Sequence, residues 1–183
     1  MTSTSMGKIL AAAATLVLVA VVGTFAWSGF KSPPVAAPAA IVTTPPGWVK
    51  LDGGSFTLYA PSGSELRKAE KDGLAYGDII NAPQCIRFQA GKRAAPAVNS
   101  QTHPDFADEP ITVDGRLATL RKAILQANEQ QYWFPGCGAP FYASLIVPGA
   151  SGDLVIDVTA TSAASLDDAV TMFKSVRIVK VAP

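Results

Sequence analysis

The sequence is poor in the side chains on which most enzyme sites depend. Its 183 residues include one histidine, His103, and two cysteines, Cys85 and Cys137. A single histidine removes most histidine-based catalytic and metal-binding arrangements. No Gly-x-Ser-x-Gly, Walker or dinucleotide-binding pattern is present, and Ser64 and Ser144 have no base nearby in the sequence. The sequence therefore predicts no catalytic residue and no small-molecule cofactor.

An excess of charge of either sign is also absent. From Gly47 onward, 13 Lys and Arg stand against 14 Asp and Glu, because Lys8 and Lys31 precede this part of the chain. The charges are scattered and form no basic stripe, so nucleic acid is not an expected partner.

Acidic residues follow His103 closely, at Asp105, Asp108 and Glu109. A calcium loop needs acidic residues at alternating positions, a central glycine and a distal glutamate, and this spacing does not match that pattern. We therefore expect no metal site here, and we interpret His103 as a solvated loop residue.

The most informative segment is an apolar run at residues 9–27, nineteen consecutive residues without a charge. As an α-helix it would span roughly 29 Å, which matches a hydrocarbon core of about 30 Å and exceeds the apolar region of a usual signal peptide. Phe25 and Trp27 are typical of the interfacial end of a spanning helix. We expect a transmembrane helix or signal anchor at residues 9–27, after a short cytoplasmic N-terminus at residues 1–8.

The alternative is a cleaved signal peptide, with small-residue cleavage sites at Thr24-Phe25-Ala26 or Ala37-Pro38-Ala39. No cysteine follows the apolar run closely, which excludes a lipid-modified N-terminal cysteine. Lys8 favours a cytoplasmic N-terminus. We expect a single-pass protein of the inner (cell) membrane with a periplasmic, extracytoplasmic C-terminal domain, or a secreted protein if the segment is cleaved.

A linker rich in proline and alanine is expected at residues 28–46, with prolines at positions 33, 34, 38, 45 and 46. Such a sequence favours extended polyproline geometry, so it could hold the following domain up to about 40 Å from the bilayer.

Both cysteines lie in the expected extracytoplasmic domain at residues 47–183. An oxidising compartment favours a disulfide between Cys85 and Cys137, which would stabilise the fold by roughly 4 kcal/mol in the chain-entropy model. Two alternatives are free structural cysteines and a reactive thiol at Cys137, which stands between Gly136 and Gly138. No neighbouring histidine or basic cluster would lower the pKa of that thiol.

The pattern of the domain predicts an α+β fold with an antiparallel sheet and a helix packed on one face. The helix begins at Ser165, with Asp168 completing a capping box. A short helix is predicted at residues 65–71 and an irregular loop at residues 91–110. The predicted strands are residues 48–51, 55–60, 74–81, 84–90, 141–147, 154–161 and 176–181, with a further hairpin at residues 111–125 that turns at Asp114-Gly115.

Three consecutive aromatic residues, Tyr132, Trp133 and Phe134, precede the turn at Pro135-Gly136. Aromatic side chains offer large contact areas and a loop can present them, so they are the candidate partner-binding surface. The alternative is that they fill the core beneath the disulfide.

The two ends of the domain resemble PsbP-like domains. The resemblance is carried by Trp48-Val49-Lys50-Leu51 with residues 55–61, and by residues 154–161 with the segment Ser165 to Ile178, and it covers roughly residues 47–181. It implies an antiparallel sheet between helical layers, an α/β/α sandwich. Such domains generally bind other proteins, and the resemblance implies no shared catalytic set.

The sequence is compatible with two functions. The first is a membrane-tethered extracytoplasmic domain without catalytic activity that binds an envelope protein or supports an assembly. The second is an envelope enzyme that uses Cys137 or an acidic pair of the loop. A free thiol of low pKa at Cys137 would favour the second.

Overall fold

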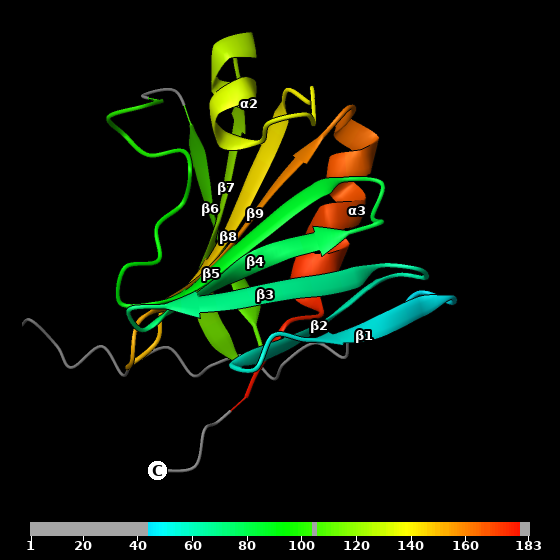
Figure 1. The fold of residues 1–183 in the computed structure, drawn as a ribbon, viewed down its shortest axis with the longest axis vertical. Helices are drawn as coiled ribbons and strands as arrows, with labels where there is room; N and C mark the ends of the chain where they lie inside the picture. The colour runs from blue at the N-terminus through cyan, green and yellow to red at the C-terminus, as the bar shows by residue number, and fades with distance from the viewer. Residues whose placement is uncertain (1–43, 104–105, 180–183) are drawn as a thin grey trace, which may run out of the picture. The chain divides into compact units, whose positions relative to one another are not determined.

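The computed structural model describes residues 44–103 and 106–179 (Figure 1). The expected cytoplasmic N-terminus, the expected membrane segment at residues 9–27 and most of the linker lie outside these residues. Among the helices of residues 44–103 and 106–179, none is long and apolar enough to cross a membrane.

A seven-stranded antiparallel sheet forms the centre of the domain, in the order β3-β4-β5-β9-β8-β7-β6. Figure 1 shows that each strand is rotated relative to the one before it, so that β3 runs horizontally in the view while β6 and β7 run vertically. This is the twist expected of a β-sheet. The strands are β3 (Glu65–Lys71), β4 (Leu74–Ile80), β5 (Cys85–Gly91), β6 (Ala107–Val113), β7 (Arg116–Ile124), β8 (Phe141–Val147) and β9 (Asp153–Ala160).

A smaller antiparallel sheet joins the two ends of the domain, in the order β1-β2-β10. Its strands are β1 (Trp48–Asp52), β2 (Phe56–Pro61) and β10 (Arg177–Ile178). Ser175, at the end of the last helix, ties this sheet down because its hydroxyl accepts a hydrogen bond from the backbone N–H of Tyr59 at 2.9 Å.

One face of the large sheet is covered by the helix α3 (Ala163–Lys174) and by the small sheet. Apolar side chains of both sheets and of α3 form the main core here. Phe56 of β2 and Phe88 of β5 meet edge to face, with ring centroids 5.2 Å apart. The fully buried members include Leu58, Leu120, Leu145, Ile156, Met172 and Phe173.

The opposite face of the large sheet is covered only in part. An irregular segment at residues 92–103, which we call the strap, and the short helix α2 (Ala127–Trp133) lie over it. Together with the sheet they enclose a second, smaller core of Ala97, Val98, Leu125, Phe134 and Tyr142. The two faces of one sheet therefore carry two separate cores.

The predicted α+β class with an antiparallel sheet is confirmed. The predicted helix at residues 65–71 is wrong, because this segment is strand β3 and pairs with β4 along its whole length. The turn between them is Asp72-Gly73, with φ of 53° and 73°. Two positive φ values are typical of a type I′ hairpin turn, for which Asp-Gly is a preferred sequence.

Several predicted boundaries also differ from the structure. Helix α3 begins after Ser162, whose hydroxyl accepts a hydrogen bond from the backbone N–H of Ser165 at 3.2 Å, so Ser165 is not the N-cap. Strand β6 occupies the end of the predicted loop at residues 91–110. Residues 127–133, which include Tyr132 and Trp133, form helix α2 instead of a loop. The last strand is Arg177–Ile178, and residues 180–181 of the predicted strand 176–181 lie outside the described residues.

Candidate functional site

A row of polar side chains crosses the large sheet on the face opposite α3. The strand register places one residue of each strand directly opposite the next, and we call this set the transverse row. Apart from one serine, positive and negative side chains alternate, an arrangement that stabilises antiparallel pairs. Its members, from edge to edge, are Arg67, Asp78, Arg87, Asp157, Ser144, Arg121 and Asp108.

The row contains ion pairs on both sides of its centre. Arg87 Nε lies 3.3 Å from Asp78 Oδ1. Arg121 donates from Nε and Nη2 to the two oxygens of Asp108, at 2.8 Å each. This hydrogen-bonded pairing lowers the pKa of Asp108 and raises that of Arg121. Such two-point pairing fixes the orientation of the guanidinium group.

The centre of the row is a buried carboxylate. Asp157 is 2% exposed and accepts a hydrogen bond from the Tyr142 hydroxyl. Burial raises the pKa of Asp157 to about 6, and the hydrogen bond from Tyr142 together with the proximity of the Ser144 hydroxyl and the Ala97 backbone offsets only part of that effect. Burial, followed by the nearby Asp157 charge, raises the pKa of Tyr142 well above its ordinary value. A raised carboxylate pKa means that the ionised form is the costly one in this environment.

Two further buried hydroxyls flank Asp157. Ser144 lies directly opposite it on β8, and Thr159 is two positions along β9. Their Oγ and Oγ1 atoms are buried and have no hydrogen-bond partner of normal geometry within the part of the chain that the structure describes. The centre of the row thus holds two hydroxyl groups, each of which could donate or accept a further hydrogen bond.

The strap is fastened to this centre by polar contacts. The backbone N–H of Val98 donates to the Tyr142 hydroxyl at 3.4 Å, and Arg121 Nη1 donates to the Val98 carbonyl at 2.8 Å. Gln89 Nε2 reaches the Ala95 carbonyl at 3.5 Å. Arg121 also lies over the Phe106 ring, 3.9 Å from its centroid. Both Arg121 and Tyr142 therefore connect the row to the strap.

The predicted disulfide between Cys85 and Cys137 is confirmed, with a Cα–Cα distance of 6.2 Å. It joins the start of β5 to the turn that follows α2. Next to it, Arg87 Nη1 donates to the Trp133 carbonyl at 2.8 Å and lies 5.5 Å from the Phe134 ring centroid. The end of α2 is therefore fixed to the sheet by one covalent bond and by a member of the transverse row.

The three predicted aromatic residues are divided between core and surface. Phe134 is buried in the second core, with its ring centroid 6.3 Å from that of Tyr142. Tyr132 is 76% exposed, and its ring meets the half-buried Trp133 edge to face at 4.8 Å. We call Tyr132 and Trp133 the aromatic tip. Sequence reasoning could not separate these roles, because α2 was not predicted.

The other predicted candidates show no catalytic arrangement. His103 is half-buried rather than solvated, and its Nε2 lies 2.7 Å from the Ile124 carbonyl. Asp105 lies outside the described residues, while Asp108 and Glu109 pair with Arg121 and Lys122. Cys137 has no free thiol. Residues 44–103 and 106–179 contain no group of three His, Cys, Asp or Glu side chains placed to bind a metal.

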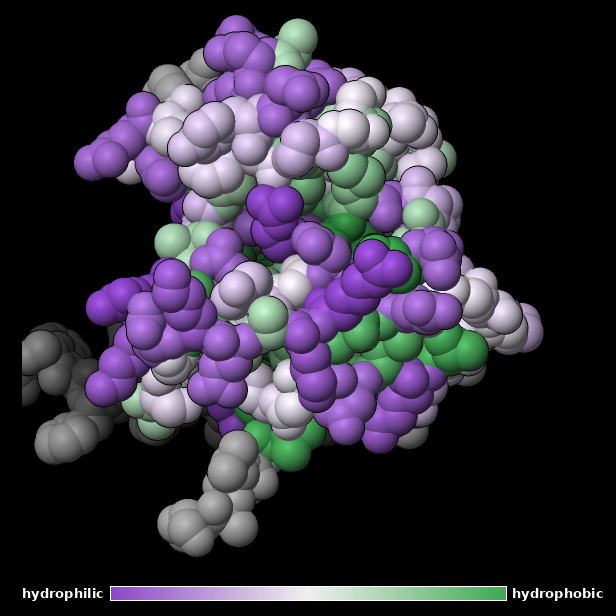
Figure 2. Space-filling model, in the orientation of Figure 1, coloured by the Kyte–Doolittle hydropathy of each residue, from purple (hydrophilic) through white to green (hydrophobic). Residues whose placement is uncertain are grey.

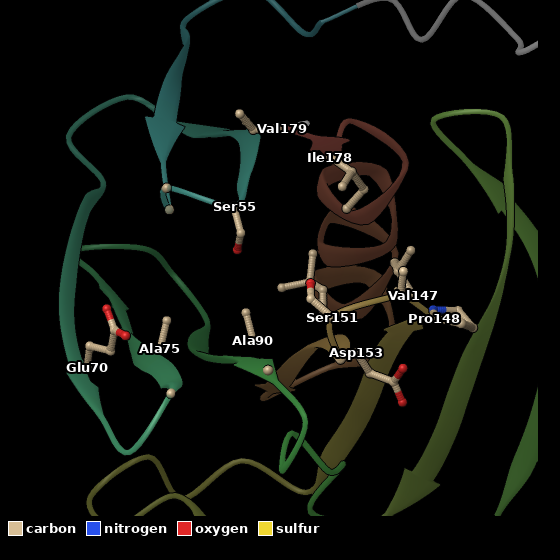
Figure 3. Close-up of a pocket in the computed structure, with 18 of the residues that line it drawn as sticks. Ser55, Glu70, Ala75, Ala90, Val147, Pro148, Ser151, Asp153, Ile178 and Val179 are labelled. Carbon is tan, nitrogen blue, oxygen red and sulfur yellow. The ribbon is translucent and has the colours of Figure 1, made fainter. Parts of the chain in front are cut away.

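A cleft of about 720 Å³ lies at the opposite end of the strands from the aromatic tip. Figure 3 shows the space between the turns that join β1 to β2, β3 to β4 and β8 to β9. Small apolar side chains such as Ala75 and Ala90 line it, and charges of both signs stand around it. Its glycines have a packing role, since a Cβ on Gly152 would collide with the Gly91 backbone. The lining shows no nucleophile paired with a base.

Comparisons with known proteins assign no family to this fold. No family model matches the sequence, and no curated protein matches it. Among solved structures, the chain is similar to a protein from Bacteroides thetaiotaomicron VPI-5482, with 14% sequence identity and a TM-score of 0.41. The match covers 70% of this chain and 46% of that one, so the chain spans about half the length of that protein. Such values support no inference about function.

Proposed function

We propose that this chain is a membrane-tethered extracytoplasmic domain of the PsbP-like kind that binds an envelope protein without catalysing a reaction. Residues 9–27 would anchor it, or would direct its secretion if they are cleaved. The observation that carries the proposal is the exposed ring of Tyr132, which meets Trp133 edge to face at a braced end of the sheet.

The composition around the tip favours a protein over a lipid or a nucleic acid. Residues 123–140 contain no lysine or arginine, and Glu129 is their single charged residue. Anionic membranes and nucleic acids are bound chiefly through basic side chains. A large aromatic ring in an otherwise neutral polar surface is instead typical of the energetic centre of a protein interface.

The bracing of the tip also supports a binding role. The Cys85–Cys137 disulfide, the bond from Arg87 to the Trp133 carbonyl and the buried ring of Phe134 fix the end of α2 from three sides. A surface that is ordered before binding loses less conformational entropy when the partner arrives. Tyr132 is thereby presented in one defined position.

Two structural features support the proposed compartment and family. A disulfide that joins the two cysteines of the chain fits an oxidising compartment. Helix α3 on one face and α2 on the other agree with the sandwich that a PsbP-like resemblance implies.

The test is site-specific photo-crosslinking of the full chain in its native membrane. A photoreactive phenylalanine analogue at position 132 should give one discrete protein adduct, and Trp133→Ala in the same chain should reduce its yield about tenfold. The matched control places the analogue at Leu117, which is 74% exposed on the hairpin at the opposite end of β7.

Identical adducts from both positions would overturn the proposal, and so would an absence of any protein adduct at position 132. Adducts with lipid alone would show that the aromatic tip lies in the bilayer interface, where tyrosine and tryptophan are also enriched. That outcome also contradicts a protein partner.

A further inference from the structure

We propose that the strap is a pH-sensitive cover over Asp157, which closes in mild acid, opens more often as the pH rises to neutrality, and so controls how firmly the aromatic tip is held. The regulation of the tip rests on the proposed function. The behaviour of the strap itself does not, because it concerns contacts within this chain.

The strap is the cover that keeps water from Asp157. Ala97 and Val98 of the strap are 7% and 1% exposed, and Tyr142 and Asp157 beneath them are 0% and 2% exposed. No regular hydrogen-bonded ladder fixes the strap to the sheet, since it contains no strand or helix. Its attachment includes the contacts of Ala95 and Val98 with Gln89, Tyr142 and Arg121. The Ala97 backbone also contacts Asp157 itself, and His103 contacts the Ile124 carbonyl at the end of the strap. A segment fastened in this way opens locally at a lower free-energy cost than the strands below it.

The charge on Asp157 opposes that closure. An ionised carboxylate is stabilised by water and is destabilised when it is buried. The pKa of Asp157 in the closed structure is raised to about 6 by burial. A protonated carboxyl group, in contrast, can itself donate a hydrogen bond, and Ser144 Oγ directly opposite, which has no partner of normal geometry in the described part of the chain, can accept one. The closed strap therefore fits the protonated side chain better than the ionised one.

Other charged and titratable groups face Asp157 from the packed elements, and they do not reverse this preference. Arg87 of β5 lowers its pKa, but less than burial raises it. Arg121 of β7 is neutralised by Asp108, Arg87 is paired with Asp78, and Tyr142 of β8 is uncharged at these pH values because its pKa is raised. The strap residues from Ala94 to Val98 carry no charge, and His103 contacts Glu129 of α2, at the far end of the strap.

The strap and the tip share one small core, which couples them. Val98 and Phe134 both pack in the second core with Tyr142. The Arg87 side chain, opposite Asp157 in the register, donates to the Trp133 carbonyl. Opening the strap removes one wall of this core, so Phe134 and the end of α2 lose packing. Tip order should therefore fall when the strap opens.

The sign and size of the effect follow from the two pKa values. The closed-state pKa is about 6 and the ordinary value, which a hydrated open state would approach, is 3.8. Closure of the strap is therefore most favourable at a pH below the ordinary pKa of Asp157. This preference is lost as the pH rises through the pKa of the closed state. One pKa unit corresponds to tenfold in the equilibrium, so the opening constant should rise by on the order of a hundredfold in total. Between pH 4.5 and 7.5 we expect an increase of about twentyfold.

Hydrogen exchange measured by mass spectrometry on the full chain tests this inference. With rates corrected for intrinsic exchange at each pH, amides of residues 94–99 should lose about twentyfold protection between pH 4.5 and 7.5, while peptides from α3 stay unchanged. The Asp157→Asn variant should remove this pH dependence. His103→Asn is the matched control, and it should retain the pH dependence.

A pH-independent strap in the wild-type chain would overturn the inference, as would a pH dependence that survives in Asp157→Asn or disappears in His103→Asn. If Asp157→Asn does not fold, ¹³C NMR of the wild-type Asp157 carboxyl group decides the question. A midpoint near 6 agrees with the inference, and a midpoint near 4 contradicts it. If the strap shows the expected pH dependence but position 132 gives no protein adduct, the proposed function is refuted and the inference about the strap is not.

Discussion

The two faces of the large sheet differ in the kind of side chain that they bury. The face toward α3 is apolar across the central strands and merges with the small sheet in one continuous core. The other face carries charged residues on six of its seven strands, in a single row, under a cover that has no strands of its own. Figure 2 shows the uncovered part of this second face, where hydrophilic side chains lie over β3 and β4.

The same strands supply both faces, and β9 shows the contrast within one element. Ile156 and Val158 point to the main core, whereas Asp157 and Thr159 point to the strap side, and all four are buried. Apolar contacts are tolerant of small shifts, while hydrogen bonds and ion pairs are directional. We infer that the α3 face supplies most of the stability and that the strap face positions the parts that function requires.

Phe88→Ala should have the largest effect, because it removes a fully buried ring from the α3 face. We expect a loss of about 3–5 kcal/mol in the free energy of unfolding, measured by denaturant titration. The control is Gln89→Ala, the next residue on β5, whose side chain lies on the other face and should change stability by less than about 0.5 kcal/mol. Similar losses for both variants would contradict the contrast between the faces.

The elements of the α3 face could largely be predicted from local sequence. The alternation of residues 154–161 and the turn Asp114-Gly115 specify β9 and the hairpin of β6 and β7, because each pattern is complete within a few residues. Strand β3 was missed because Glu-Leu-Arg-Lys-Ala-Glu-Lys has one large apolar residue and favours a helix by propensity. The Asp72-Gly73 turn after it was the available signal.

The transverse row could not be predicted from the sequence. Its members come from strands up to 90 positions apart in the chain, since Arg67 and Asp157 belong to the same row. Which of them face one another depends on the order of the strands and on their register, and a shift of one residue would move every side chain to the other face. The cysteine pair was predictable because a chain with two cysteines, expected in an oxidising compartment, leaves a single partner for each.

Arg121→Lys should have an intermediate effect, because it keeps the charge but loses the planar group. Lysine cannot reproduce the two bonds to Asp108 together with the bond to the Val98 carbonyl and the contact with the Phe106 ring. We expect a loss of about 2 kcal/mol, measured by thermal unfolding, with strap amides affected first.

The control is Lys122→Arg, whose ion pair with Glu109 is more exposed, and it should be nearly neutral. The hydrogen bond from Arg121 also lowers the pKa of Asp108. The stability that this pair contributes is therefore fully present at a pH above the ordinary carboxylate pKa, and it is lost as the pH falls through the lowered pKa. The difference in the free energy of unfolding between the wild type and Arg121→Lys should therefore become smaller as the pH falls. A difference that grows in acid would contradict the pairing.

Ser162→Ala should have the smallest effect, and it decides between two positions for the start of α3. The structure makes Ser162 the N-cap, so its loss should cost about 1 kcal/mol, while Ser165→Ala should cost less because its hydroxyl bonds only to that of Ser162. A larger effect at Ser165 would instead support the capping box with Asp168. Since α3 covers the apolar face alone, neither variant should change the exchange of residues 94–99. If Ser162→Ala loosens the strap, the two faces are coupled through the sheet, and their separate roles would have to be abandoned.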